Sequence, residues 1–522
     1  MRQPQAWVSP GTWLRPSLTD LLLGSLVAWL FVAGEGWKVL LADGDTGWHI
    51  RTGDWILQTG SIPSRDIFSF SRSGEPWFAW EWLSDVAFSV VHSHWGLAGV
   101  AALTGSVLAL GALAVFGHML WRGTNLLVAL ATLLVAVSAS AIHYLARPHI
   151  FTLLLLPVSL WMAERDLRKP SPAVWMLVPL SILWVNLHSG FFALPACLAV
   201  MAVGHGVEKW LDRERRAVDW RGPARLGALA AATAAVSVAN PYGFGLHRHI
   251  WNYLRSDWIR NAVDEFQSPR FRSENLLHFE LLLLSALVLT GWLASRRRIA
   301  DGLLVLVWAH LALGSVRHVP LFVLVAAPMV AVEASRLWEN WAGRRPARCM
   351  GRVLWQAGQD LCTGFRRPSA WSALAVAGLL LVTPAAKWPR DFPEAKFPIA
   401  LIQTSANDLS GARLFASDQW GDYLIYRNWP GQRVFIDGRS DFYGPEVGGD
   451  YLRLVEGRPG WQTLLDKYDF SAALVPRQGP LAALLEGDSG WRLVRQDGLA
   501  SLFVRNGTQS RERANPIARL DR

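Results

Sequence analysis

Residues 18–49, LTDLLLGSLVAWLFVAGEGWKVLL followed by ADGDTGWH, decide the fold class. The apolar part, residues 18–41, is long enough as a helix to cross a hydrocarbon core of ~30 Å. Charged side chains follow at once, beginning with Asp43 and Asp45. An acidic pair where a chain leaves a bilayer can bind a cation or take a proton from an acceptor hydroxyl. The alternative interpretation is an exposed acid pair that caps an irregular, solvated loop.

Similar apolar runs recur along the chain and predict an α-helical polytopic membrane protein. Of 522 residues, 52% are hydrophobic and 18% are charged, and the mean hydropathy is positive. The 29 tryptophans, many of them at the ends of runs, are typical of an aromatic interface belt. We predict about eleven transmembrane helices, near residues 18–41, 96–120, 124–144, 149–163, 173–187, 191–208, 224–240, 276–294, 301–316, 319–335 and 370–386.

Arginine-rich connections predict the orientation of these helices. They are the N-terminus, residues 165–169, 209–225 and 296–298, and the arm 336–367. The positive-inside rule makes them cytoplasmic. The prediction is a bacterial inner-membrane protein with a cytoplasmic N-terminus. The net charge of +10 is then explained mostly by the arginines of the cytoplasmic connections, and no nucleic-acid partner is expected.

Two parts follow from composition. Residues 1–386 form the transmembrane bundle, with a long first periplasmic loop at 42–95. Residues 387–522 are mixed in composition and predict a periplasmic α/β domain. We expect its strands at residues 412–417, 433–437, 472–476, 491–495 and 500–505, and its helices near 419–428, 445–456 and 460–468.

Polar side chains gather in the connections predicted to face outward. Ionisable groups at a membrane edge are costly and usually functional. The candidates are His49, Arg51, Glu81, Arg147, His149, Asn186, His188, Glu265, Arg317 and His318. Each also has a structural interpretation, such as a helix end or a solvated acid. A zinc hydrolase is disfavoured because the sequence has no His-Glu-x-x-His motif.

The order of these motifs resembles the bacterial integral-membrane glycosyltransferases of the GT-C architecture, within or near a broad, poorly characterised group. The resemblance covers nearly the whole chain. It rests on the Asp-x-Asp start of the first loop and on its continuation through Ile62-Pro63, Asp66, Pro76-Trp77 and Glu81-Trp82. Arg147-Pro148-His149, Trp184-Val-Asn186-Leu-His188, Asn240-Pro-Tyr-Gly243 and Arg317-His318-Val-Pro320 complete it.

The resemblance implies a function and assigns roles. Such enzymes move a sugar from a polyprenyl-phosphate-linked donor to an acceptor at the outer face. Asp43 or Asp45 would act as the base or as a metal ligand, and the cofactor would be a divalent cation, Mg²⁺ or Mn²⁺, if any. Arg147, His149, Arg317 and His318 would bind the donor phosphate. One donor held at both ends requires Asp43 or Asp45 to lie within roughly 10–12 Å of these cations.

The C-terminal part is loosely similar to the soluble domain of oligosaccharyltransferase catalytic subunits. There, a Trp-Trp-Asp-Tyr-Gly element helps to read the acceptor. This implies acceptor binding by Trp420, Asp422, Tyr423, Asp437 and Arg439. The match is permuted. In the alternative interpretation, Asp437 pairs with Arg439 and Trp420 packs in the core.

Two functions therefore stand. The first is a glycosyltransferase whose partners are the bilayer, a polyprenyl-phosphate sugar and a glycan, lipid or protein acceptor. The second is a non-catalytic membrane protein that binds a lipid-linked glycan or a partner in envelope assembly or transport.

Overall fold

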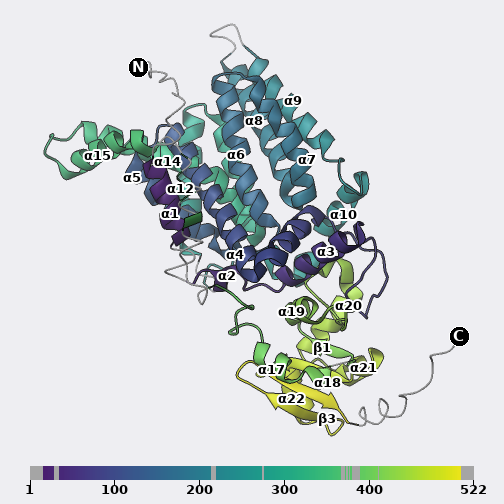
Figure 1. Ribbon diagram of the computed structural model, residues 1–522. Helices are drawn as coiled ribbons and strands as arrows, with labels where there is room; N and C mark the ends of the chain where they lie inside the picture. Colours follow the sequence, from purple (N-terminus) through teal and green to yellow (C-terminus); the bar gives the residue numbers. More distant parts are fainter. Residues whose placement is uncertain are drawn as a thin grey trace. The chain divides into compact units, whose positions relative to one another are not determined.

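The computed structural model describes residues 16–28, 35–212, 219–272, 276–365, 388–409 and 411–506, with isolated positions between 369 and 378. The chain forms two compact units (Figure 1). Unit 1 comprises residues 1–40, 101–251 and 263–388, and unit 2 comprises residues 41–100, 252–262 and 389–522.

Unit 1 is a bundle of apolar helices. Its described helices are α1 (Leu18–Ala28), α2 (Trp37–Leu40), the second part of α4 (Trp82–Trp121), α5 (Leu126–Ser140), α6 (His149–Arg168), α7 (Leu177–Leu187), α8 (Ala193–Leu211), α9 (Arg221–Val236), most of α10 (Phe244–Arg255), α12 (Leu277–Ser295), α13 (Ile299–Gly314), α14 (Val319–Gly343) and α15 (Met350–Phe365). Short 3-10 turns join them, among them η5 (Ser189–Phe192), η6 (Asp264–Phe266) and η7 (Val316–His318).

Small residues let these helices approach closely, as expected when packing rather than the hydrophobic effect drives association in a bilayer. A Cβ atom on Gly204 of α8 would clash with Ala300 of α13, and one on Gly111 of α4 would lie 2.8 Å from the Leu153 carbonyl oxygen of α6.

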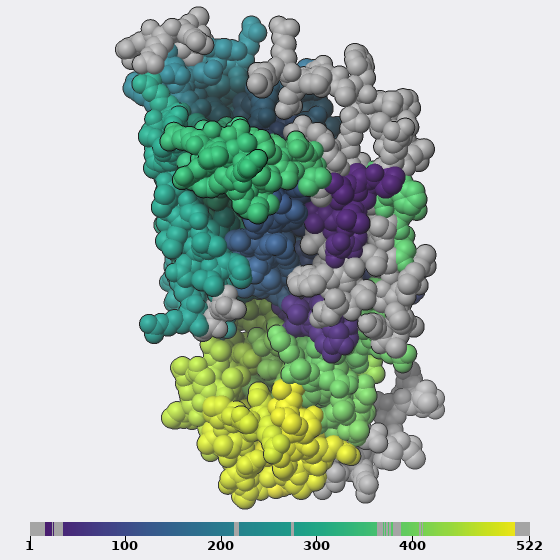
Figure 2. Space-filling model, turned by 90° about the vertical axis from the view of Figure 1, so that its left-hand side faces the viewer, coloured from purple at the N-terminus to yellow at the C-terminus, as the bar shows by residue number. Residues whose placement is uncertain are grey.

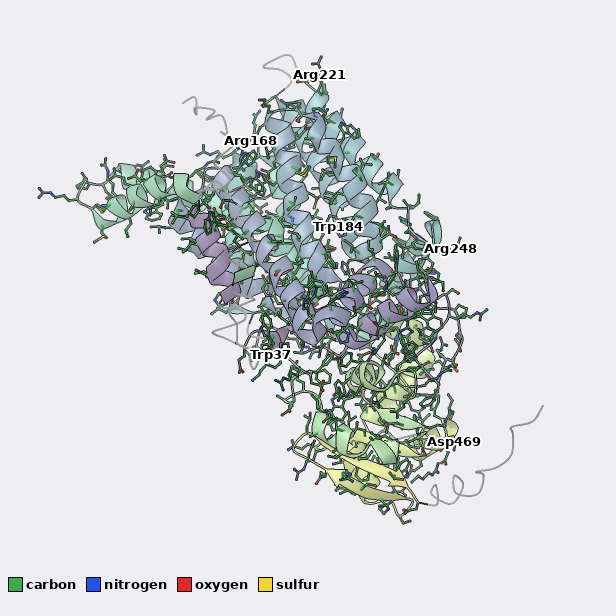
Figure 3. The ribbon with its side chains drawn as sticks, viewed as in Figure 1. Trp37, Arg168, Trp184, Arg221, Arg248 and Asp469 are labelled. Carbon is green, nitrogen blue, oxygen red and sulfur yellow. The ribbon has the colours of Figure 1, made fainter. Side chains whose placement is uncertain are left out.

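The helical class is confirmed, and the number of spans stays a prediction. Five described helices are long and apolar enough to cross a membrane: Trp82–Trp121, Leu126–His143, Ser189–Leu211, Leu277–Ser295 and Val316–Gly343. Two shorter apolar helices, Pro172–Leu187 and Ile299–Gly314, coincide with other predicted spans. The predicted spans at 18–41 and 370–386 fall partly outside the described residues. Arg168 and Arg221 lie at the same end of unit 1 (Figure 3), as two of the arginine-rich connections require.

Unit 2 combines a small sheet with helices. The sheet has the order β1-β2-β4-β3, with β1 (Leu414–Ala416) parallel to β2 (Ala472–Pro476), and β4 (Ala500–Arg505) antiparallel to both β2 and β3 (Trp491–Gln496). Its helices are α3 (Asp45–Thr59), the start of α4, α11 (Asp257–Ala262), α17 (Ile399–Thr404), α18 (Ala406–Leu409), α19 (Asp418–Asn428), α20 (Ser440–Val455), α21 (Trp461–Lys467) and α22 (Pro480–Glu486).

Two sequence predictions for unit 2 are wrong. The second of the five predicted strands, residues 433–437, is a single bridge from Val434 to Ser69 and not a strand of the sheet. Its alternating pattern arises because Val434 and Phe435 are buried against residues 68–71 of the first loop, to which they hydrogen bond. The first loop is also not irregular throughout, because Asp45 begins the helix α3.

Candidate functional site

Asp43 and Asp45 lie at the N-terminal end of α3, and both are buried, with 9% and 4% of their surfaces exposed. The Asp45 backbone N–H donates to Oδ1 of Asp43 at 2.9 Å. The first turn of a helix presents unsatisfied N–H groups and a partial positive charge, which stabilise an anion there. The expectation of an exposed, solvated acid pair is therefore wrong.

Glycines bring α3 against α19. A Cβ atom on Gly44 would clash with the Gln419 carbonyl oxygen, and one on Gly47 would lie 2.6 Å from the Asp422 carbonyl oxygen. The Gly44 N–H donates to Oε1 of Gln419 at 2.8 Å. Only residues without a side chain permit this approach, which places Asp422 beside Asp45.

Asp45 and Asp422 face the same glycine. A Cβ atom on Gly438 would fall on Oδ1 of Asp45 and 3.1 Å from Oδ2 of Asp422. The Gly438 N–H donates to Oδ1 of Asp422 at 2.9 Å, whereas Oδ2 of Asp422 is buried and has no hydrogen-bond partner among the described residues. Burial raises the pKa of Asp422 well above its ordinary value, and the charges of Asp45 and Asp437 raise it further.

Asp45 and Asp422 together offer carboxylate oxygens to a cation. Carboxylate oxygens are the ligands that Mg²⁺ and Mn²⁺ prefer, and the unpartnered Oδ2 of Asp422 beside Asp45 fits that chemistry. Within the described ranges, however, no group of three or more His, Cys, Asp or Glu side chains is placed to hold a metal. Asp422 could contribute oxygen ligands together with Asp45, and metal binding by the predicted pair Asp43 and Asp45 stays a prediction.

His49 lies four residues further along α3 and is fully enclosed. Its Nδ1 is 2.5 Å from Oδ1 of Asp85, and its Nε2 is 3.8 Å from Oε2 of Glu81. Arg51 pairs with Asp54 at 2.8 Å and donates to the Tyr426 carbonyl oxygen. The side chains of His49 and Glu81 thus lie close together, and the hydrogen bond from Arg51 to Tyr426 connects α3 to α19.

Asp437 and Arg439 form a buried network. Nε of Arg439 donates to Oδ1 of Asp437 at 2.7 Å, and Nη2 donates to Oδ2 of Asp437 at 2.6 Å and to Oδ1 of Asp66 at 2.7 Å. The Tyr443 hydroxyl donates to Asp437 at 2.6 Å. The guanidinium also lies over the ring of Trp77, at 4.5 Å. These contacts join the first loop to the C-terminal segment.

The pairing of Asp437 with Arg439 and the packing of Trp420 are thus both present. Trp420, Tyr423, Asp437 and Arg439 are at most 5% exposed, and the Trp420 indole donates to the Lys396 carbonyl oxygen at 2.9 Å. An acceptor could reach these side chains only after rearrangement. Acceptor binding by this segment stays a prediction.

Unit 1 holds the predicted phosphate-binding arginines. Nη1 of Arg147 is 2.5 Å from Oε1 of Glu265, and Nε of Arg317 is 3.7 Å from Oε2. Burial would raise the pKa of Glu265, but the charges of Arg147 and Arg317 outweigh it and hold that pKa well below its usual range. Glu265 is fixed by its own backbone, whose carbonyl oxygen accepts from the Ser315 hydroxyl at 2.8 Å. Two arginines therefore converge on one carboxylate, a geometry that also suits a phosphate.

The predicted histidines of unit 1 are mostly engaged in structural hydrogen bonds. Nε2 of His149 is 2.6 Å from the His143 carbonyl oxygen. Nδ1 of His188 accepts from the Gly190 N–H at 3.0 Å, and the Thr152 hydroxyl is 2.8 Å away. A backbone N–H can only donate, so Nδ1 of His188 is the acceptor in its contact with Gly190.

The remaining two predicted residues are held in the same way. Nδ1 of His318 is 3.2 Å from the Leu311 carbonyl oxygen. Asn186 donates to the carbonyl oxygens of Ile182 and Ala239 at 2.7 and 2.9 Å. These contacts favour helix-end roles for both residues.

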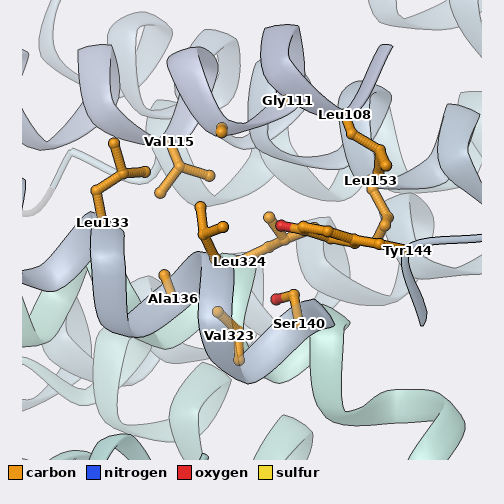
Figure 4. A pocket seen from close by; sticks show the side chains of 12 residues that line it. Leu108, Gly111, Val115, Leu133, Ala136, Ser140, Tyr144, Leu153, Val323 and Leu324 are labelled. Carbon is orange, nitrogen blue, oxygen red and sulfur yellow. The ribbon is translucent and has the colours of Figure 1, made fainter. Parts of the chain in front are cut away.

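A mostly apolar cavity lies among α4, α5, α6 and α14 (Figure 4). Its volume is only about 20 Å³, and its lining is aliphatic except for Ser140 and Tyr144. A space of this size is far below the several hundred cubic ångströms of a typical ligand pocket.

Solved structures share this fold. The archaeal oligosaccharyltransferase AglB from Archaeoglobus fulgidus, in complex with an inhibitory peptide and a dolichol-phosphate, matches with a TM-score of 0.58 and 11% identity over 88% of this chain and 69% of that chain. An Archaeoglobus fulgidus oligosaccharyltransferase tethered with an acceptor peptide containing the NVT sequon matches with a TM-score of 0.54 and 11% identity, over 90% of this chain and 70% of that one.

ArnT from Cupriavidus metallidurans, bound to undecaprenyl phosphate, gives a TM-score of 0.48 at 11% identity, over 96% of this chain and 99% of that chain. No family profile and no curated protein matches the sequence. The two oligosaccharyltransferase matches confirm the resemblance to GT-C membrane glycosyltransferases at the level of the fold.

Several residues of these clusters were not among the predicted site residues. Asp66 and Tyr443 hold Arg439, Asp85 holds His49, and Asp418 lies one turn before Asp422. The available signal was glycine next to acid: Gly44 before Asp45, Gly421 before Asp422 and Gly438 after Asp437. Glycines at such positions indicate a close backbone approach.

Proposed function

We propose that this protein is a membrane glycosyltransferase that moves a sugar from a polyprenyl-phosphate-linked donor to an acceptor on the periplasmic face. The observation that carries the proposal is Asp45, a buried carboxylate at a helix N-terminus opposite Asp422, within a fold shared with an oligosaccharyltransferase solved with a dolichol-phosphate.

The chemistry follows from the carboxylate. Asp45 is as enclosed as the side chains of the predicted acceptor segment, so a rearrangement must first open it to the acceptor. It then accepts the proton of the acceptor nucleophile while that nucleophile forms a bond to the anomeric carbon. The bond between the anomeric carbon and the phosphate oxygen breaks, and polyprenyl phosphate leaves with the electron pair. Arg147 and Arg317 hold the departing phosphate in place of their present partner Glu265.

Asp45 acts as the base or as a metal ligand. A divalent cation bound at Asp45 and Asp422 would supply positive charge to the departing phosphate. A loss of turnover on chelation, restored by Mg²⁺ or Mn²⁺, assigns Asp45 and Asp422 to the cation, whereas turnover that is unchanged by chelation assigns Asp45 to proton transfer.

Substitution of Asp45 tests the function. The Asp45→Asn variant of the purified full-length protein should lose ~10²–10⁴ in turnover of a polyprenyl-phosphate sugar, the usual effect of removing a general base. Because Asp45 is buried beside another acid, the change also relieves repulsion with Asp422, so the variant should stay folded. Asp43→Asn, measured in parallel, decides which of the two acids, Asp43 or Asp45, is the one that turnover requires.

The matched control is Asp257→Asn in the same unit. The Asp257 side chain is 83% exposed, so its neutralisation should leave turnover unchanged. A deletion strain should also accumulate the lipid-linked donor and lose one cell-surface glycan. If both Asp43→Asn and Asp45→Asn keep full transfer at normal expression, the catalytic role of this segment fails. Binding of the lipid-linked glycan without turnover would instead establish the non-catalytic alternative.

The proposal includes a location. We propose that residues 389–506 lie on the periplasmic side of a bacterial inner membrane, because the arm at 336–367 carries the arginines typical of cytoplasmic connections. A C-terminal reporter that is active only in the cytoplasm should therefore be silent. An active reporter would mean that the number of membrane spans before this domain differs by one from the prediction.

A further inference from the structure

Helix α15 presents three different faces. One face docks on unit 1, where the Asn125 side chain donates to the Trp355 carbonyl oxygen at 2.8 Å and Sγ of Cys362 lies 3.6 Å from the Thr124 carbonyl oxygen. A Cβ atom on Gly358 would clash with Asn125. This face fixes the rotation of the helix.

A second face is apolar and exposed. Met350, Val353, Leu354 and Leu361 are 71%, 44%, 44% and 50% exposed, and Ala357 between them is exposed as well. These five residues, the apolar strip, follow the spacing i, i+3, i+4, i+7, i+11, which lines one side of a helix. The third face of the helix is polar and carries Arg352, Gln356 and Gln359. The helix is amphipathic: one side docks on unit 1, and the apolar strip is left exposed by the described residues.

The charge next to the strip is strongly positive. The connection from α14 to α15 contains the exposed arginines Arg344, Arg345 and Arg348. With Arg352, four arginines stand against one acid, Asp360, between the end of α14 and the end of α15. The Arg345 guanidinium lies 5.1 Å from the ring of Trp341, at the end of α14.

The position of α15 connects these features to a bilayer. It begins shortly after Gly343, the last residue of α14, whose helix is long and apolar enough to cross a membrane. In Figure 1, α15 runs across the direction of α6 and α8 rather than along it, and Figure 2 shows it as a green ridge at the surface of unit 1. A helix at this place, with an apolar strip and neighbouring arginines, matches the pattern of an interfacial helix.

We propose that α15 lies in the interface of the leaflet where α14 ends, with its apolar strip in the acyl boundary and Arg344, Arg345, Arg348 and Arg352 on anionic lipid headgroups. The occupant of the strip is an anionic lipid surface, because the arginines supply the complementary charge and α14 brings the strip to that depth. Arginine stems can extend along the apolar boundary while their guanidinium groups reach phosphates.

Spin-label accessibility in the full-length protein tests this proposal. The protein is reconstituted in nanodiscs of phosphatidylcholine with or without phosphatidylglycerol, on a background with Cys349→Ala and Cys362→Ala. Cys197 is fully buried and stays. A nitroxide on V353C in the apolar strip should be more accessible to oxygen than to a water-soluble nickel chelate. A nitroxide on Q356C on the polar face should show the reverse, and phosphatidylglycerol should deepen the first label.

Neutralising the arginines tests whether their positive charge binds the anionic lipid. Arg344→Gln, Arg345→Gln and Arg348→Gln together should remove the effect of phosphatidylglycerol on the label at position 353. The matched control removes three exposed arginines of unit 2, with Arg433→Gln, Arg453→Gln and Arg458→Gln, and should leave that effect in place.

Three outcomes overturn the proposal. Nickel access at both labelled positions would place the strip in water. A depth at position 353 that is the same in both lipid mixtures would remove the anionic-lipid assignment. Exclusion of both relaxing agents, with spin–spin coupling between copies, would make the strip an interface with a second chain.

Discussion

Buried charges in unit 2 are of two kinds, and their partners distinguish them. Arg439 is surrounded by carboxylates, a phenol and aromatic rings, so its charge is compensated within the network, although its Nη1 also has no hydrogen-bond partner among the described residues. Asp422 is equally buried, but its Oδ2 has no hydrogen-bond partner among the described residues. A buried charge that its partners neutralise has a structural role. A buried acid that lacks such partners and lies beside a second acid is instead a candidate for a functional role.

Removal of Arg439 should therefore cost stability. Arg439→Ala leaves Asp437 and Asp66 buried without their cation, and breaking a buried pair in this way typically costs about 3–5 kcal/mol. Thermal or denaturant unfolding of the purified protein measures the loss. Lysine cannot reproduce the two-armed contact with Asp437, so Arg439→Lys should rescue only part of the loss.

The control for this prediction is Arg458→Ala. Arg458 is 60% exposed and pairs with Glu456 at the surface, where loss of a pair usually changes stability by less than about 0.5 kcal/mol. If both arginine variants unfold at the same point as the parent, the Arg439 network contributes nothing to stability and the distinction drawn between the two kinds of buried charge is lost.

At the scale of elements, α3 and α19 form the structural basis of the candidate site. Sequence patterns predicted α19 and most of the strands, because these segments have regular alternation or helical spacing. They did not predict α3, since its start, Asp45-Thr46-Gly47, reads as a turn and its polar residues leave only a short apolar face. The contact with α19 stabilises α3, and that contact joins residues 375 positions apart in the chain.

The α3–α19 contact makes a prediction of its own. Gly47→Ala should destabilise the protein by about 1–3 kcal/mol, because the added methyl group would lie 2.6 Å from the Asp422 carbonyl oxygen in a packed contact. It should also lower turnover by displacing Asp422 from Asp45. Gly449→Ala in α20 is the control: a Cβ atom there meets nothing within 4 Å, so the change should stabilise the helix by about 0.5–1 kcal/mol. Equal unfolding of the two variants would contradict the close packing of α3 on α19.

At the scale of the whole molecule, composition was enough for the membrane class, and motif order was enough for the shared fold. The pairing of side chains was not predictable in the same way. Arg147 and Arg317 were selected as free cations for a phosphate, yet each already lies near Glu265. Asp437 and Arg439 were selected for an acceptor, yet they are enclosed with Asp66 from the first loop. Such pairings depend on contacts between distant segments, which periodicity along one segment does not report.

The proposed reaction requires groups from distant parts of the chain to act on one donor. A donor held by its phosphate at Arg147 and Arg317 and attacked at its sugar near Asp45 requires these groups to come within roughly 10–12 Å of one another. Gln419 is a suitable probe on unit 2, because its side chain lies 3.5 Å from Asp43. With Cys349→Ser as background, a bifunctional thiol reagent of that span should join Q419C to R317C. It should not join Q419C to R221C, which lies in the connection where α9 begins. Failure of the first pair to crosslink, with and without a bound lipid-linked sugar, would separate the phosphate-binding arginines from the acid pair and leave Asp45 to act without them.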